Sequence, residues 1–152
     1  VEFLIAPNVG EALRPLNRIA SGGEISRVML ALKTVLSEID RVSIVVFDEV
    51  DSGIGGGTAT VVGRKLRQLA ESRQVVCITH LPQIAAMADR HFRVEKAVQG
   101  DRTRTTATQL DDEGRVAELA QMLGGDTKTS RAHARELMRG MASTGSKSKH
   151  RV

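Results

Sequence analysis

The chain has 152 residues, of which 41% are apolar and 26% are charged, a composition that is typical of a folded globular domain and excludes a disordered chain. No apolar run approaches the roughly 20 residues that a membrane-spanning helix needs. The formal net charge is +4, but Lys147, Lys149 and Arg151 near the end of the chain carry three positive charges. The remainder is nearly neutral, so basicity alone does not indicate a nucleic-acid surface.

Cysteine and aromatic content narrow the class of protein further. The single cysteine, Cys77, excludes an internal disulfide and favours a reducing, intracellular setting. It lies in an apolar run, so we expect a core thiol and not a nucleophile. Trp and Tyr are absent, which removes the usual stacking platforms for single-stranded nucleic acid. The chain begins inside an apparent strand, so we expect a segment of a longer protein.

The first half of the chain alternates strands and helices. Residues 1–6 are β-prone, and a polar loop follows over residues 8–17. A helix is predicted next, because apolar residues recur at helical spacing on one face: Ile25, Val28, Met29, Leu32, Val35, Leu36 and Ile39. Residues 44–47 are uniformly apolar, as in a strand that is covered on both faces.

The next elements repeat this order. A glycine-rich turn over residues 53–57 leads into a helix whose apolar positions are Ala59, Val62, Leu66 and Leu69. Residues 75–79 are predicted to form a second buried strand. Strands that alternate with helices along the chain predict an α/β fold with a mainly parallel sheet flanked by helices.

The last third is predicted to hold a short helix over residues 83–89 and a hairpin of strands 91–96 and 103–110. Two further helices are expected, one around residues 116–123 that ends at Gly124-Gly125 and one around residues 134–141. We expect one domain over residues 1–142 and a disordered basic tail over residues 143–152.

Ser21-Gly22-Gly23-Glu24 is the first candidate site. Ser21 and Glu24 have the spacing of a capping box, in which each side chain bonds the other residue's backbone N–H. A capping box does not explain Gly22 and Gly23, because each is about 1 kcal/mol worse than alanine inside a helix. Paired glycines would let an anion approach the positive end of the helix closely. Plain capping and phosphate binding both remain open on spacing alone.

Polar side chains follow both predicted parallel strands. Asp48-Glu49 comes directly after the first strand, and Thr79-His80 ends the second. Ligands of open α/β sheets bind at this carboxyl edge. One carboxylate there could hold Mg²⁺ and its neighbour could act on a water molecule, although acids also end strands where the chain simply leaves the core.

In combination, these motifs resemble the carboxyl-terminal lobe of an ABC-type ATPase head of the P-loop NTPase class. Their order matches the signature motif, the Walker B motif, the D-loop and the switch histidine. The runs over residues 19–27, 47–56 and 78–83 more narrowly resemble the RecN family of bacterial DNA repair proteins, which is related to the SMC proteins. Glu24 stands where transporters usually have glutamine, which favours the SMC-like branch.

The resemblance implies a role for each matching residue. Glu49 would polarise the hydrolytic water, and His80 would sense the γ-phosphate. Asp48 would hold the magnesium shell, and Asp51 would lie in the D-loop that couples two sites across a dimer. The residues implied at the nucleotide are Ser21, Gly22, Gly23, Glu24, Asp51 and, as a weak candidate, Gln83.

The resemblance also implies ATP and Mg²⁺ as cofactors, a homodimer through ATP-engaged heads, and a cytoplasmic, nucleoid-associated role in double-strand-break repair and recombination on DNA, with no membrane. No P-loop motif, G-x-x-x-x-G-K-[S/T], occurs between a strand and a helix in this sequence, so we expect the chain alone to be inactive and to need an amino-terminal lobe. Two alternatives are a fragment of a transporter's nucleotide-binding subunit and a non-catalytic interaction module.

Overall fold

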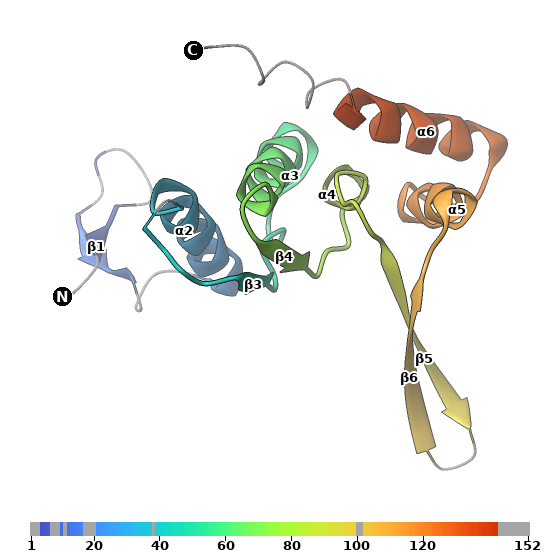
Figure 1. Cartoon of the computed structure of the whole chain (residues 1–152), viewed down its shortest axis with the longest axis horizontal. Helices are drawn as coiled ribbons and strands as arrows, with labels where there is room; N and C mark the ends of the chain where they lie inside the picture. Colours follow the sequence, from blue (N-terminus) through green and yellow to red (C-terminus); the bar gives the residue numbers. More distant parts are fainter. Residues whose placement is uncertain are drawn as a thin grey trace. The chain divides into compact units, whose positions relative to one another are not determined.

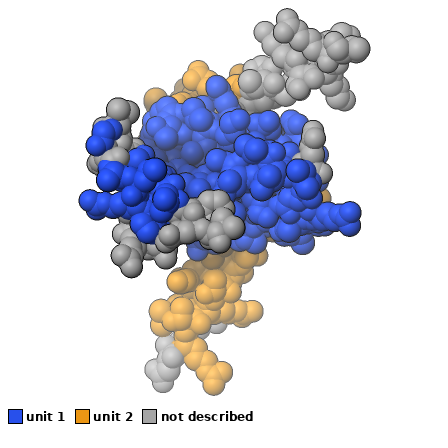
Figure 2. Space-filling view, turned by 90° about the vertical axis from the view of Figure 1, so that its left-hand side faces the viewer, with its two compact units in different colours: residues 1–79 blue, residues 80–152 orange. Residues whose placement is uncertain are grey.

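The chain folds into two units, residues 1–79 and residues 80–152, which have different colours in Figure 2. The structure is a computed structural model that describes residues 4–6, 10, 12–16, 21–37, 39–99 and 102–142. The single domain expected over residues 1–142 stays a prediction. Among the described residues, no helix combines the length and the apolar character that crossing a bilayer requires.

The first unit is built around a parallel strand pair. Its elements are β1 (Leu4–Ile5), β2 (Arg14–Pro15), α2 (Gly22–Val35), β3 (Ile44–Phe47), α3 (Gly56–Ala70) and β4 (Gln74–Cys77), and all of them except β2 carry a label in Figure 1. Strands β3 and β4 run parallel, with Ile44 opposite Gln74 and Phe47 opposite Cys77, whereas β1 and β2 are antiparallel. Arg14–Pro15 was expected in a loop, but its pairing with Leu4–Ile5 makes it a short strand.

The core of the first unit contains the apolar face that the sequence predicts for α3. Ala59, Val62, Leu66 and Leu69 are all buried, since spacings of three and four residues place them on one side of the helix. Their buried apolar neighbours in this unit are Leu30, Val45, Phe47 and Val50.

The burial expected for β3, β4 and α2 was wrong. Val45 and Phe47 are buried, but Ile44 and Val46 are 56% and 61% exposed, so β3 is covered on one face only. In and directly after β4, Val76 and Ile78 are 43% and 58% exposed, so this strand is not covered on both faces either. Helix α2 ends at Val35, which is 80% exposed, and its buried apolar residue is Leu30 and not the predicted stripe. An apolar pattern identifies a face that can be buried; it does not identify what covers that face.

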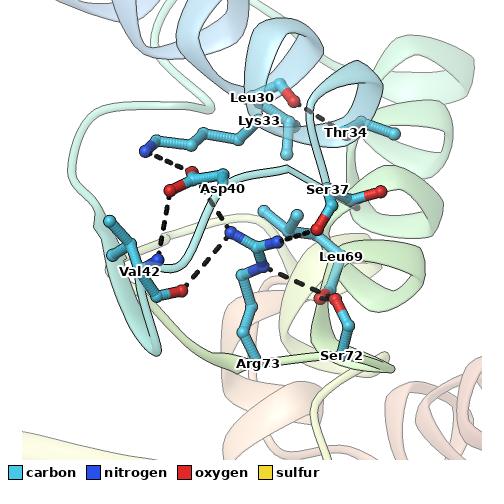
Figure 3. A network of polar contacts seen from close by, with 9 residues as sticks. All are labelled: Leu30, Lys33, Thr34, Ser37, Asp40, Val42, Leu69, Ser72 and Arg73. Atoms are coloured by element: carbon cyan, nitrogen blue, oxygen red, sulfur yellow. Dashed lines mark hydrogen bonds and ion pairs between the residues drawn. The ribbon is translucent and has the colours of Figure 1, made fainter.

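A polar network around Arg73 joins the ends of three elements in the first unit (Figure 3). The Arg73 side chain is 3% exposed. It donates to the Ser37 carbonyl oxygen at 2.8 Å and to Asp40 Oδ2 at 3.2 Å. Asp40 also accepts from Lys33 Nζ at 2.6 Å and from the Val42 backbone N–H at 3.1 Å. The network therefore ties the chain after α2 to the starts of β3 and β4.

The second unit combines a helical cluster with a hairpin. Its elements are α4 (Pro82–Ala85), β5 (Phe92–Gln99), β6 (Arg102–Gln109), α5 (Asp112–Met122) and α6 (Lys128–Ala142). The predicted hairpin is confirmed, and it is longer than expected. Gly124 and Gly125 have φ angles of 108° and 134°, which other residues rarely adopt. Helix α5 therefore ends just before this glycine pair, as predicted.

The core of the second unit lies among α4, α5 and α6. Its buried members are Ala85, Ala86, Val116, Leu119 and Ala134. The tail predicted over residues 143–152 lies outside the described residues. Parallel pairing is confined to β3 and β4 within the described part of the chain, so the larger, mainly parallel sheet stays a prediction.

Candidate functional site

Helix α2 begins with the predicted capping box. The Glu24 backbone N–H donates to Ser21 Oγ at 3.3 Å, and the Ser21 backbone N–H donates to Glu24 Oε2 at 2.8 Å. Both bonds satisfy donors that a helix start leaves without an intrahelical partner. The Glu24 carboxylate is therefore engaged by its own helix, and the predicted capping box is confirmed.

The loop over residues 48–52 follows β3 and presents two exposed acids. The Asp48 Oδ1 atom accepts from the Glu49 backbone N–H at 2.9 Å. Glu49 has a φ angle of 56° and is the one non-glycine residue with a positive φ in the described part of the chain. A residue in this region costs on the order of 1–3 kcal/mol and persists only where its surroundings hold it, commonly at functional sites.

The two glycines of α2 contact this loop closely. A Cβ atom placed on Gly22 would overlap the Glu49 Oε2 atom, and one placed on Gly23 would lie 2.8 Å from both the Glu49 carbonyl oxygen and the Ser52 Cβ atom. A side chain at Gly22 would push the Glu49 carboxylate aside, whereas a side chain at Gly23 would require a shift of the loop backbone. The structure thus brings Gly22 and Gly23 together with Glu49, and it supplies a packing reason for two glycines that capping left unexplained.

Ser26 and Arg27 are site residues to which the sequence analysis assigned no role. Ser26 Oγ donates to the Asp48 carbonyl oxygen at 2.7 Å. Arg27 Nη1 donates to the carbonyl oxygens of Val50 and Ser52 at 3.2 and 2.8 Å. Ser26 and Arg27 follow Gly23 by three and four residues, which places them on the same side of the helix. This spacing is the sequence signal that could have identified them as site residues.

Asp51 is the buried acid of this loop. It is 3% exposed, and its Oδ2 atom accepts from Thr79 Oγ1 at 2.6 Å. This bond joins the segments that follow β3 and β4, as expected for residues at one sheet edge. Burial, followed by the negative charges of Asp51 and Asp48, raises the pKa of Cys77 to about 12. The thiol therefore stays protonated at neutral pH, in line with the expected core thiol.

The other two candidates belong to the second unit. His80 is exposed and directly follows Thr79 in the chain. Gln83 has a buried side-chain oxygen, Oε1, that has no hydrogen-bond partner among the described residues. No group of three or more His, Cys, Asp or Glu side chains in the described part of the chain could hold a metal ion.

Comparison with known proteins identifies relatives over most of the chain, although no family model matches it. The DNA repair protein RecN of Treponema pallidum is 59% identical over 141 residues, which are 91% of this chain and 25% of that protein. The RecN proteins of Streptomyces coelicolor and Bacillus subtilis are 52% and 44% identical, again over 91% of this chain and 24% of theirs. The predicted resemblance to RecN is confirmed, and the chain spans about a quarter of the length of these relatives.

A solved structure supports the fold. A chain from structural work on ATP-driven dimerization and DNA-stimulated activation of SMC ATPases matches with a TM-score of 0.51 and 18% identity. The match covers 78% of this chain and 70% of that one. The chain therefore shares its α/β fold with part of an SMC ATPase.

Proposed function

We propose that this chain, which resembles RecN along nearly its whole length, forms the carboxyl-terminal lobe of the ATPase head of a RecN-like DNA repair protein. The observation that carries the proposal is the close approach of the α2 glycines to Glu49, a strained acid at the carboxyl end of a parallel strand. Backbone strain of this kind is common at functional sites. Glu49 also lies at the edge of the sheet where α/β proteins bind their ligands.

Each carboxylate at this edge has a separate role in the proposal. The Asp48 Oδ2 atom makes no hydrogen bond among the described residues and would be a ligand of Mg²⁺, which would offset the negative charge of the ATP phosphates. One or two carboxylates suffice for Mg²⁺ when phosphate oxygens and water complete its shell. Glu49 would orient and deprotonate the attacking water. By resemblance, His80 would sense the γ-phosphate and Gln83 would contact the nucleotide.

The signature segment would act on a second molecule. Ser21, Gly22 and Gly23 start a helix whose positive end favours an anion, and here the γ-phosphate of ATP on the opposite head would be that anion. Asp51, held by Thr79, would fix the D-loop at the dimer interface. ATP binding would thus join two heads, and hydrolysis would release them, which links the cycle to binding of broken DNA in the nucleoid.

The rest of the protein would supply the P-loop. Since this sequence lacks one, the chain alone would neither grip the β- and γ-phosphates nor hydrolyse ATP. The exposed apolar face of β3 and β4 would contact that missing lobe. Parallel strands are normally covered on both faces, whereas Val46 and Ile78 are 61% and 58% exposed here.

The test is ATP hydrolysis by the full-length protein that contains this chain. Glu49→Gln should lower kcat by about 10²- to 10⁴-fold, the usual contribution of a general base, and should stabilise an ATP-bound dimer visible by light scattering. Glu71→Gln, an exposed acid at the end of α3, should behave like the wild type. A full-length Glu49→Gln variant that hydrolyses ATP at the wild-type rate would refute this assignment.

One observation favours a second candidate, the non-catalytic interaction module. The capping box and the packing of Gly22 and Gly23 against Glu49 give these residues structural reasons to be present. A full-length wild-type protein that binds its partners but neither binds nor hydrolyses ATP would favour the module over the ATPase.

A further inference from the structure

The second turn of α2 holds the catalytic loop through its backbone. Ser26 Oγ bonds the carbonyl oxygen of Asp48, directly before Glu49, at 2.7 Å. Arg27 Nη1 bonds the carbonyl oxygens of Val50 and Ser52, beyond Glu49, at 3.2 and 2.8 Å. Glu49 is thus flanked on both sides by carbonyl groups that one helix anchors.

Glu49 needs such anchoring because of its backbone. A φ angle of 56° is unfavourable for a glutamate. In a loop without anchoring contacts, the backbone at this residue would relax to a negative φ angle. Within the loop, the Ser52 backbone N–H bonds the Glu49 carbonyl oxygen at 2.9 Å. The Glu49 backbone N–H also donates to Asp48 Oδ1 at 2.9 Å. Both of these bonds lie within the loop, and the links from α2 add contacts to a neighbouring helix, so that together they hold this conformation.

The geometry of Arg27 suits this task. One planar guanidinium reaches two carbonyl oxygens that lie two residues apart, and the same Nη1 atom lies 3.0 Å from the position of a Cβ on Gly23. Arg27 is therefore packed between the start of α2 and the loop. A lysine keeps the positive charge and several N–H donors on one nitrogen, so it could replace these bonds in part.

We propose that Ser26 and Arg27 are positioning residues that fix Glu49 to α2, so that engagement of the helix start sets the orientation of the catalytic carboxylate. The inference rests on the proposed ATPase function. It predicts a loss in the chemical step and not in nucleotide binding, because neither side chain is placed at the nucleotide.

The experiment measures kcat and KM for ATP in the full-length protein, together with hydrogen exchange of the peptide over residues 48–54. Arg27→Gln should lower kcat at least tenfold, with KM changed less than threefold, and should speed exchange at Ser52 and Ile54. Arg27→Lys should recover part of the lost kcat. Ser26→Ala, a milder variant that removes one hydroxyl, should lower kcat two- to fivefold. Arg64→Gln, an exposed arginine on α3, is the matched control and should change neither quantity.

The outcomes separate the two proposals. A wild-type protein without ATPase activity would refute the proposed function, whatever the variants do. An active wild-type protein whose Arg27→Gln variant keeps its kcat would overturn the positioning role, even if exchange in the loop becomes faster. An equal loss of kcat in Arg64→Gln would also overturn it, because the effect would then follow from surface charge.

Discussion

At the residue scale, Arg73 forms a dense set of polar contacts in the first unit, although it is not a member of the candidate site. Its guanidinium bonds Ser37, Asp40, Ser72 and the Val42 carbonyl oxygen while almost wholly buried (Figure 3). Breaking a buried charged network by removing one partner is costly, because the remaining polar groups lose their bonds without regaining water.

Arg73→Met should therefore lower the free energy of unfolding of the chain by about 2–4 kcal/mol, measured by urea denaturation. Arg93→Met is the matched control. Arg93 forms ion pairs with Glu95 and Glu118, but its side chain is 44% exposed, so its loss should cost about 1 kcal/mol or less. Equal losses for the two variants would mean that burial of the Arg73 network does not contribute to stability.

The same network predicts a pH dependence at Asp40. The hydrogen bond from Lys33, with further contributions from the Val42 backbone N–H and the charge of Arg73, holds the pKa of Asp40 below its ordinary value of 3.8. The Asp40 carboxylate then binds a proton more readily in the unfolded chain than in the folded chain. The contribution of ionised Asp40 to folding stability is therefore present above about pH 4, and it is lost as the pH falls through the lower pKa of the folded chain.

Asp40→Asn should thus lower the urea midpoint at pH 7, and the gap to the wild type should narrow at pH 3. Asparagine keeps an oxygen for the Val42 N–H, but its NH₂ group replaces the Oδ2 atom that accepts from Lys33 and Arg73. The variant therefore removes those two bonds together with the charge, and the part of the gap that changes with pH reports the charge. Glu71→Gln, an exposed acid at the end of α3, should give no gap that changes with pH. A gap for Asp40→Asn of the same size at both pH values would contradict the assignment.

At the scale of elements, local patterns predicted the elements but not what covers them. Spacing placed the buried face of α3 correctly, and the glycine pair placed the end of α5. The same kind of pattern misled for α2, since its apolar stripe is largely exposed and Leu30 is buried instead. Periodicity depends on the sequence within one helix, whereas burial depends on neighbours that are distant in sequence.

The candidate site divides in the same way. Motif order indicated Ser21–Glu24 and the acids after β3, and the structure brings these two segments into contact in one unit. The bonds from Ser26 and Arg27 span 22 to 25 residues, and no local propensity encodes a contact at that separation. The positive φ of Glu49 is likewise a product of tertiary packing, because glutamate has no preference for that region.

At the scale of the whole molecule, the β3–β4 pair leaves one apolar face exposed. Ile44, Val46, Val76 and Ile78 on that face are 43–61% exposed. The sequences of parallel strands are usually continuous apolar runs, because helices or other parts of the protein cover both faces of the sheet. The relatives are about four times as long as this chain, and in the proposed head their remaining length would supply the covering lobe.

Replacing Val46 and Val76 together by threonine tests this covering. Threonine keeps the β-branched shape, so the chain alone should change its free energy of unfolding by no more than about 0.5 kcal/mol per site. Association with the separately expressed remainder of the protein should weaken by about 2 kcal/mol, on the order of 30-fold in Kd, because two hydroxyl groups would be buried without partners.

Val94→Thr provides the control for that experiment, since Val94 lies on β5 and is 62% exposed. It makes the same chemical change on an exposed strand outside the first unit, and it should leave the Kd unchanged in a titration calorimeter. An unchanged Kd for the double variant would mean that the remainder of the protein does not cover this face. In that case the exposed strands would need another partner, because an apolar face on a parallel pair does not remain in water without a cost of about 25 cal/mol for each Å² exposed.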